Sequence, residues 1–284
     1  MSQFPPDVYA LIDASIAEDQ TFNDPTTQAV VPPEIQGTGW LRAKATGVLA
    51  GVDVAIAVFQ RIDPTLDAKA ILQDGSALCA GDDIAVVRGS AAGILRAERI
   101  ALNFMQRMSG IASDTNRYVE AVRGLKARIV DTRKTAPGHR FLDKYSVRMG
   151  GGYNHRLNLA DGILIKDNHI QANAFREMGL KEVIQLALAR ASHTIKVEVE
   201  VEDMEQVNAA LEAGAHIIML DNMSVSEMAE ATKVIGDKAI VEASGGITYD
   251  TVRAVAETGV DLISIGGLTH SVHALDISLD LEFD

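Results

Sequence analysis

Short β-branched runs alternate with longer stretches of helical periodicity between residues 127 and 265, and this alternation restricts the fold more than any other feature. Repeated strand–helix units predict a parallel sheet in an α/β fold. Two helical stretches, Met204–Ala213 and Val225–Ile235, are each followed by a glycine, Gly214 or Gly236, where a helix should end. The expected strands are Arg128–Val130, Ile163–Ile165, Ile195–Val199, Ile217–Leu220, Ile240–Val241 and Leu262–Ile265.

The residues before this region predict a separate α+β unit. Ala91–Ile111 has apolar residues at helical spacing and predicts a long helix leading out of that unit, so we place the domain boundary near residue 110. Ala274–Phe283 alternates Leu and Ile with Asp and Ser, which predicts a strand that pairs back onto the first unit. The other expected elements are a helix over Pro5–Asp19 and strands within Gly39–Val48 and Ala68–Val87.

The charge balance excludes some partners. The formal net charge of −13 disfavours nucleic acid and anionic lipid, because both need a basic surface. No apolar run approaches the roughly 18 residues that span a bilayer, and the first residues lack the features of a signal peptide, so we expect a cytoplasmic protein with no membrane partner. The single cysteine, Cys79, lies in an alternating segment and is expected to pack against other residues rather than to react.

The stretch from residue 127 to residue 169 is basic although the chain is acidic. It holds eight Lys or Arg against four Asp, a local charge of +4, which favours binding of a small anion. Within it, His155 and Arg156 follow three glycines. Because Arg can hold a carboxylate through two parallel hydrogen bonds and His adds a further donor, we interpret this pair as a binding element for a planar acid.

Polar residues follow nearly every expected strand, at the carboxyl ends where α/β barrels place their active sites. Glu200 and Asp221 lie at neighbouring strand ends and suit Mg²⁺, which prefers one or two carboxylates together with substrate oxygens. The alternative is that these carboxylates pair with Lys134 and Lys166. Because side chains alternate along a strand, the assignment of Glu200 requires its strand to end near Val199. The candidate residues at strand ends are Thr132, Arg133, Lys134, Lys166, Glu200 and Asp221.

Paired glycines follow the last two strands. Ser244-Gly245-Gly246 and Gly266-Gly267 each precede a helical pattern. Glycine lets the backbone approach a phosphate closely, and the N–H groups at the start of a helix attract it. The last two strands are the usual phosphate position of a barrel, so together the two turns predict phosphate binding.

Several of these motifs, in this order and spacing, resemble those of the quinolinate phosphoribosyltransferase family. The similarity runs from about residue 18 to residue 281. EASGGIT and ISIGGLTHS, at the two glycine turns, belong to it as well. The other motifs are DTRKTAPG at Asp131–Gly138, DKYSVRMGGGYNHR at Asp143–Arg156, LIKDNHI at Leu164–Ile170, VEVEVE at Val197–Glu202 and LDN at Leu220–Asn222.

The resemblance implies a two-domain subunit. It implies an N-terminal α/β sandwich over residues 1–110, completed by residues 271–284, and an open (β/α) barrel over residues 111–270. It also implies a homodimer, or a larger assembly of dimers, in which the neighbouring chain completes the active site. Taken alone, Arg99 is expected to be a solvated helix residue or a partner of Glu98, but it matches the family arginine that reaches across the dimer interface to the pyridine carboxylates.

The resemblance also implies an activity and roles for the candidate residues. The implied reaction transfers phosphoribosyl from phosphoribosyl pyrophosphate to quinolinate with loss of CO₂, giving nicotinate mononucleotide for NAD biosynthesis. The implied binding groups are Arg133, His155 and Arg156 for quinolinate, Lys134, Lys166, Glu200 and Asp221 around the ribose, pyrophosphate and Mg²⁺, and Ser244, Gly245, Gly246, Gly266 and Gly267 for the 5′-phosphate.

The sequence departs from the family pattern at Ala136, His139, Asp143 and the segment from Glu18 to Asp24, and none of these is a predicted ligand. The departures fall in the Arg133 loop and in the amino-terminal turn, so these are where we expect the local shape to differ from that of the family. Three alternatives remain open: a related nicotinate phosphoribosyltransferase or pyrophosphorylase, a Schiff-base aldolase using Lys166, and a non-catalytic anion sensor.

Overall fold

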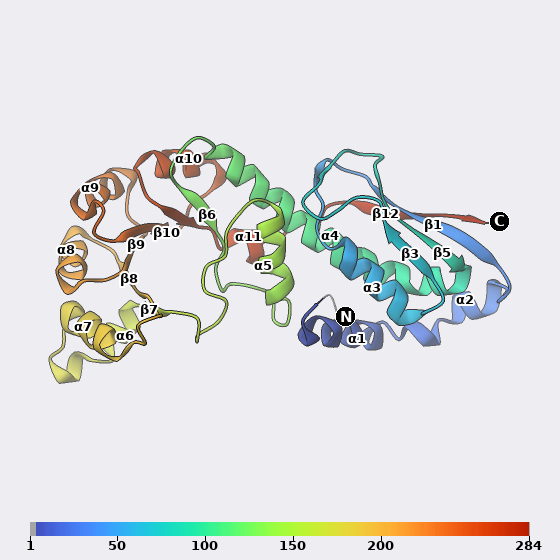
Figure 1. Cartoon of the computed structure of the whole chain (residues 1–284), viewed down its shortest axis with the longest axis horizontal. Coiled ribbons are helices and arrows are strands. Elements are labelled where there is room, and N and C mark those ends of the chain that lie inside the picture. The colour runs from blue at the N-terminus through green and yellow to red at the C-terminus, as the bar shows by residue number, and fades with distance from the viewer. Residues whose placement is uncertain (1–3, 284) are drawn as a thin grey trace. The chain divides into compact units, whose positions relative to one another are not determined.

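The computed structural model describes residues 4–283 and divides the chain into two compact units (Figure 1). The first comprises Met1–Asn116, Thr135–Gly151 and Leu268–Asp284, and the second comprises Arg117–Lys134 and Gly152–Gly267. The long helix α4 covers Ala91–Ala121, ten residues beyond the predicted end, so residue 110 lies inside a helix. No helix within residues 4–283 is long and apolar enough to cross a membrane.

The first unit is built on an antiparallel sheet. The strand order is β12-β1-β5-β3, and the predicted C-terminal strand is confirmed because Ile277 of β12 pairs with Ala43 of β1. The strands are β1 (Gln36–Ala43), β3 (Asp67–Ala70), β5 (Asp83–Ser90) and β12 (Ile277–Phe283), with a small pair β2 (Gly47–Val48) and β4 (Ala77–Leu78). The helices are α1 (Pro6–Glu18), η1 (Thr21–Asn23), α2 (Pro25–Val30), α3 (Val52–Ile62), α4, α5 (Arg140–Met149) and α11 (Gly267–His270), whose first residue belongs to the second unit.

Burial of one side of β1 and one stripe of α4 holds the first unit together. Burial alternates along β1, and side chains such as Leu41 join Phe59 and Met105 in a single hydrophobic cluster. Gly110 shows how closely α4 packs, because a Cβ there would lie 2.1 Å from the backbone oxygen of His273. A residue larger than glycine would push the C-terminal segment away from α4.

The second unit is an open six-stranded parallel sheet with helices on its convex side (Figure 1). The strand order is β6-β11-β10-β9-β8-β7, so the α/β fold with an open barrel is confirmed. The strands are β6 (Arg128–Val130), β7 (Ile163–Ile165), β8 (Val197–Val201), β9 (Ile217–Asp221), β10 (Ile240–Ser244) and β11 (Leu262–Ser264). The helices are α6 (Asp167–Gln171), η2 (Ala174–Arg176), α7 (Leu180–Arg190), α8 (Met204–Ala213), α9 (Val225–Ile235) and α10 (Tyr249–Glu257).

Two expectations from the sequence were wrong. Strand β8 continues to Val201, so the expected end near Val199 was wrong. Glu198 and Glu200 both face the inside of the sheet, as alternation requires, but they lie at different heights along the strand. Cys79 is exposed rather than packed.

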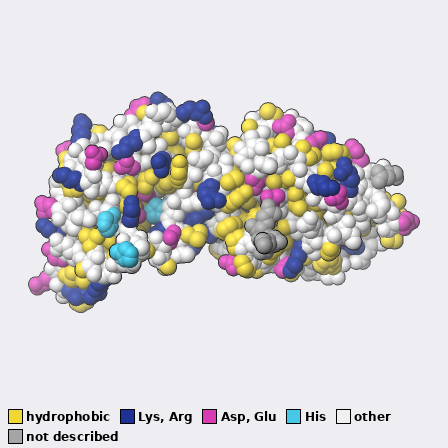
Figure 2. All heavy atoms as spheres, in the orientation of Figure 1, with side chains coloured by type: hydrophobic (Ala, Val, Ile, Leu, Met, Phe, Trp, Pro, Cys, Tyr) yellow, Lys and Arg dark blue, Asp and Glu magenta, His cyan; other side chains and the backbone are white. Residues whose placement is uncertain are grey.

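Basic and acidic side chains are interspersed over the visible face of the molecule (Figure 2).

Candidate active site

A cavity of about 420 Å³ lies at the carboxyl ends of the strands in the second unit. It brings together most of the residues that the sequence singled out, although they come from separate strands and loops. Gly266 and Gly267 do not line this cavity, and Arg99 lies in the first unit. The predicted residues that line it are Thr132, Arg133, Lys134, His155, Arg156, Lys166, Glu200, Asp221, Ser244, Gly245 and Gly246.

Two guanidinium groups give this cavity an anion-binding side. Burial and the neighbouring charge of Arg133 lower the pKa of Arg156, and Nη1 of Arg156 donates to the backbone oxygen of Gly162 at 2.9 Å. Nε of Arg133 is buried without a hydrogen-bond partner in the part of the chain that the structure describes. A buried donor without an acceptor is costly, and an anionic ligand would supply the acceptor and relieve the repulsion between the two cations.

Two carboxylates lie on neighbouring strands at the same opening. Oε2 of Glu200 pairs with Nζ of Lys166, as the alternative interpretation of these residues expected. Oδ2 of Asp221 accepts a hydrogen bond from the side chain of Asn222 at 2.7 Å. These contacts occupy one oxygen of each carboxylate. The second oxygens leave a donor set that fits Mg²⁺, which binds through one or two carboxylates plus substrate oxygens.

The turn after β10 is close-packed, and its two glycines have positive φ angles. Gly245 and Gly246 have φ angles of 90° and 60°. A Cβ on Gly245 would lie 2.2 Å from Oδ1 of Asn222, so glycine is required there for space as well as for conformation. The backbone N–H of Asn222 donates to the oxygen of Ser244 at 3.0 Å, which ties this turn to the Asp221 strand end.

Replacing Gly245 with Ala should therefore disturb the cavity and destabilise the second unit by about 2 kcal/mol, because a side chain at this φ is strained and Asn222 must move. Gly214→Ala is the matched control, since Gly214 also has a positive φ of 83° but its nearest neighbour would be 3.9 Å away. We expect about 1 kcal/mol for the control. Thermal unfolding of the two variants checks this, and equal losses of stability would contradict it.

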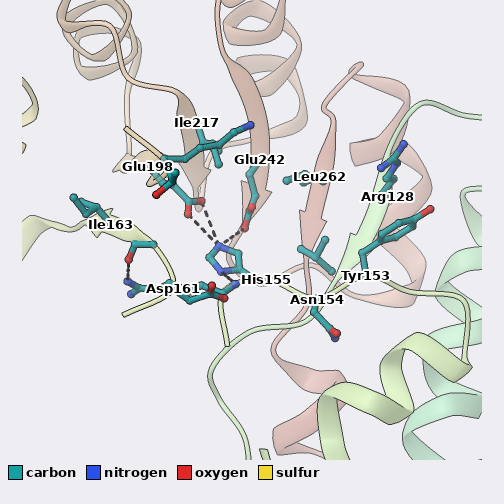
Figure 3. A pocket seen from close by; sticks show the side chains of 15 residues that line it. Arg128, Tyr153, Asn154, His155, Asp161, Ile163, Glu198, Ile217, Glu242 and Leu262 are labelled. Carbon is teal, nitrogen blue, oxygen red and sulfur yellow. Dashed lines mark hydrogen bonds and ion pairs between the residues drawn. The ribbon is translucent and has the colours of Figure 1, made fainter. Parts of the chain in front are cut away.

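Below the carboxyl-end cavity lie three side chains that the sequence interpretation did not group (Figure 3). Nε2 of His155 is 3.1 Å from Oε2 of Glu198 and 3.7 Å from Oε1 of Glu242. Both glutamates are almost fully buried, at 4% and 1% exposure. The available signal was the acidic residues in VEVEV and IVEAS, because the strands of a parallel sheet are otherwise rich in apolar side chains.

The imidazole of His155 is fixed by its surroundings. Its Nδ1 accepts a hydrogen bond from the backbone N–H of Arg156 at 2.7 Å, so the ring proton lies on Nε2, which faces the carboxylates. The backbone N–H of His155 donates to the buried carboxylate of Asp131 at 2.9 Å, and the side chain of Asn154 donates to the same carboxylate at 2.6 Å. Asp131 thus holds the segment that carries His155 and Arg156.

Arg99 belongs to another cavity, of about 370 Å³, within the first unit. It shares that cavity with Asn103, Arg107 and His139 and with the carboxylates of Glu18 and Asp19, so the cavity holds charges of both signs. Burial lowers the pKa of His139, which disfavours the charged form of its ring.

The fold and the carboxyl-end cavity define a class: an open α/β barrel whose cavity combines guanidinium groups, a glycine turn and two carboxylates. Residues 111–280 match the family described as quinolinate phosphoribosyl transferase, C-terminal domain, and residues 24–109 match its N-terminal domain. The chain belongs to the quinolinate phosphoribosyl transferase family.

Individual relatives agree with this assignment over nearly their whole length. The chain is 42% identical to the nicotinate-nucleotide pyrophosphorylase (carboxylating) of Mycobacterium leprae, over 95% of each protein. It is 41% identical to the probable enzyme of the same name from Bacillus subtilis, over 95% of this chain and 92% of the relative. The solved nicotinate-nucleotide pyrophosphorylase of Francisella tularensis superposes with a TM-score of 0.91 at 36% identity, over 99% of this chain and 98% of that one.

Proposed function

We propose that this chain transfers phosphoribosyl from phosphoribosyl pyrophosphate to quinolinate, with loss of CO₂, to form nicotinate mononucleotide and pyrophosphate in NAD biosynthesis. The observation that carries the proposal is a single cavity that holds two adjacent guanidiniums, an unpartnered buried donor on Arg133, a glycine turn and two carboxylates. A diacid and a phosphorylated sugar need this combination of groups.

In this proposal, cationic side chains orient the pyridine diacid. Arg133 and Arg156 hold the two carboxylates with Thr132 and His155 beside them, and this fixes the ring nitrogen toward C1 of the ribose. Ser244, Gly245 and Gly246, with Gly266 and Gly267 on the next strand, are the expected contacts of the 5′-phosphate. Holding two reactants in the geometry of attack is the main contribution that such a site makes to the rate.

The charges around the sugar follow the course of the reaction. As pyrophosphate leaves, positive charge develops on the ribose, and the carboxylates of Glu200 and Asp221 stabilise it. Lys134 and Lys166 stabilise the negative charge of the departing pyrophosphate. The 2-carboxylate then leaves as CO₂, because the quaternised ring nitrogen stabilises the electron pair left on C2.

We further propose that the reaction requires Mg²⁺. Glu200 and Asp221, directly or through water, are the residues that would hold it together with substrate oxygens. The ion supplies charge neutralisation of the pyrophosphate when bound. Lys166 forms an ion pair with one oxygen of Glu200, and this contact holds the Glu200 carboxylate in position near the sugar.

We also propose a cytoplasmic homodimer as the working form. Arg99 lines a cavity of the first unit with Arg107 and His139, and the resemblance implies that such an arginine reaches the pyridine carboxylates of a neighbouring chain. The dimer is then needed to complete each site. Sedimentation of the purified protein checks the assembly, and an active monomer would contradict the shared site.

The reaction itself is tested by following quinolinate-dependent release of CO₂ and pyrophosphate from the purified chain. We expect equal amounts of the two products with quinolinate, no pyrophosphate release with nicotinate, and loss of both when EDTA removes Mg²⁺. Pyrophosphate release with nicotinate would favour a nicotinate phosphoribosyltransferase. Binding of both substrates without product would favour an anion sensor.

A further inference from the structure

Glu242 lies between two cavities of the second unit. One is the carboxyl-end cavity described above, and the other, of about 510 Å³, lies at the opposite ends of the strands. The second cavity is lined by the first residues of several strands, including Arg128, Ile163 and Leu262. Glu242 lines both cavities, whereas Glu198 lines only the second one and Glu200 only the first.

The position of Glu242 is unusual for a site that binds a diacid. Its side chain is 1% exposed, and its Oε1 has no hydrogen-bond partner within the described residues. An ionised carboxylate here would repel both Glu198 and the carboxylates of the substrate, and burial adds to that cost. The arrangement therefore favours a carboxyl group that carries a proton.

The surroundings of Glu242 support the same conclusion. Burial, followed by the nearby charge of Glu198, raises the pKa of Glu242 to about 7. The nearby His155 lowers the pKa of Glu242 and so opposes this shift. Arg156 follows His155 in the chain, and the neighbouring strands contribute the neutral side chains of Met219 and Ser264. With a pKa of about 7, Glu242 carries its proton in about half of the molecules at neutral pH, as a catalytic acid must.

We propose that Glu242 is the acid that protonates C2 of the pyridine ring after CO₂ has left. The assignment rests on the proposed function, because that reaction leaves an electron pair on C2 that must gain a proton. The bond between C2 and the carboxylate breaks and its electrons stay on C2. These electrons then take the proton from the Glu242 carboxyl group, which becomes a carboxylate. One proton is consumed for each CO₂ released.

The second cavity offers a route by which Glu242 regains its proton. After the transfer, the Glu242 carboxylate lies buried beside Glu198, which makes it a strong acceptor. Water entering from the amino-terminal ends of the strands reaches it without crossing the substrate, because Glu242 lines that cavity as well. His155 lines both cavities, and its Nε2 lies 3.1 Å from Oε2 of Glu198.

A metal ion is the other occupant that His155, Glu198 and Glu242 could hold, since their ligand atoms lie within 4.8 Å of one another. The hydrogen bonds favour the proton. A metal-bound histidine usually donates its second ring N–H to an acceptor, whereas Nδ1 of His155 accepts a backbone N–H. With Nδ1 accepting, the ring proton occupies Nε2, and Nε2 is then closed to a metal.

The test compares Glu242→Gln with Glu198→Gln, which changes an equally buried carboxyl in the same cluster. Rapid-quench measurement follows pyrophosphate and CO₂ from the same samples. In Glu242→Gln the electron pair on C2 stays unprotonated and the CO₂ still held in the site adds back to it. We therefore expect net CO₂ release to slow about 100-fold while the pyrophosphate burst persists, so that the carboxylated mononucleotide accumulates. In Glu198→Gln the two products should remain coupled. Coupled release of the two products in Glu242→Gln, whatever its rate, would overturn the proposal.

Two further measurements keep this result interpretable. Calorimetric binding of quinolinate to Glu242→Gln, expected within about threefold of wild type, shows that the variant folds and binds. Glu242→Asp keeps an acid and should restore CO₂ release at least about tenfold over Glu242→Gln, and no restoration contradicts the proposal. If the wild-type chain forms no pyrophosphate and CO₂ from quinolinate, the proposed function fails instead.

Discussion

Replacing Arg156 with Ala is expected to raise the KM for quinolinate about 100-fold while leaving the KM for phosphoribosyl pyrophosphate within about threefold. Arg156 lies partly buried beside Arg133, and its own charge is already disfavoured there. A bound carboxylate would gain charge-assisted hydrogen bonds worth about 3 kcal/mol, and each 1.4 kcal/mol is a factor of about ten. Steady-state rates with each substrate varied in turn measure both constants.

Two comparisons make the Arg156 result specific. Arg156→Lys keeps the charge but loses the planar fork, so its KM for quinolinate should lie between wild type and Ala. Arg128→Ala removes the same charge from the second cavity, where Arg128 stacks on the ring of Tyr153 at 4.9 Å, and should change neither constant more than about twofold. Equal rises for both substrates in Arg156→Ala would mean that Arg156 does not hold the diacid.

The residues of the carboxyl-end cavity could be found from the sequence because parallel strands bring their ends to one edge. Once the strands before Lys166, Glu200 and Asp221 are recognised, these side chains must lie near each other. Helices α8 and α9 have the predicted bounds because Gly214 and Gly236 end them. Periodicity and stop signals are local, so they can be recognised without knowledge of the tertiary structure.

The residues inside the sheet could not be grouped in this way. Alternation places Glu198 and Glu200 on one face of β8. It does not predict that Glu198 lies close to Glu242 of another strand and to His155 of a loop. The sequence interpretation treated His155 as a free donor, whereas both of its ring nitrogens have neighbours in the fold. Contacts between distant segments determine these roles.

The position of Thr135–Gly151 shows the same limit. This segment follows β6 in the chain, yet it belongs to the first compact unit and contains α5. Asp143 on α5 is fully buried, and it accepts hydrogen bonds from Nε and Nη2 of Arg107, at 3.1 and 3.0 Å. It also accepts one from the backbone N–H of Ala136 at 3.3 Å. A departure from the family pattern is thus accommodated by a buried ion pair.

Replacing Asp143 with Asn should destabilise the first unit by about 4 kcal/mol, because it leaves Arg107 without its counter-charge at a buried site. Only 1% of the Asp143 side chain and 28% of that of Arg107 are exposed. The single tryptophan, Trp40, lies on β1 of the same unit, so urea unfolding followed by its fluorescence reports on this unit.

The matched control is Asp13→Asn in the same unit. Asp13 receives two hydrogen bonds from Arg61, both at 2.6 Å, so the two ion pairs have the same fork geometry. The Arg61 and Asp13 side chains are 54% and 45% exposed, and water therefore replaces the lost contact. The control should cost less than about 1 kcal/mol. If both variants lost the same free energy of unfolding, burial would not be what makes the Asp143 pair important.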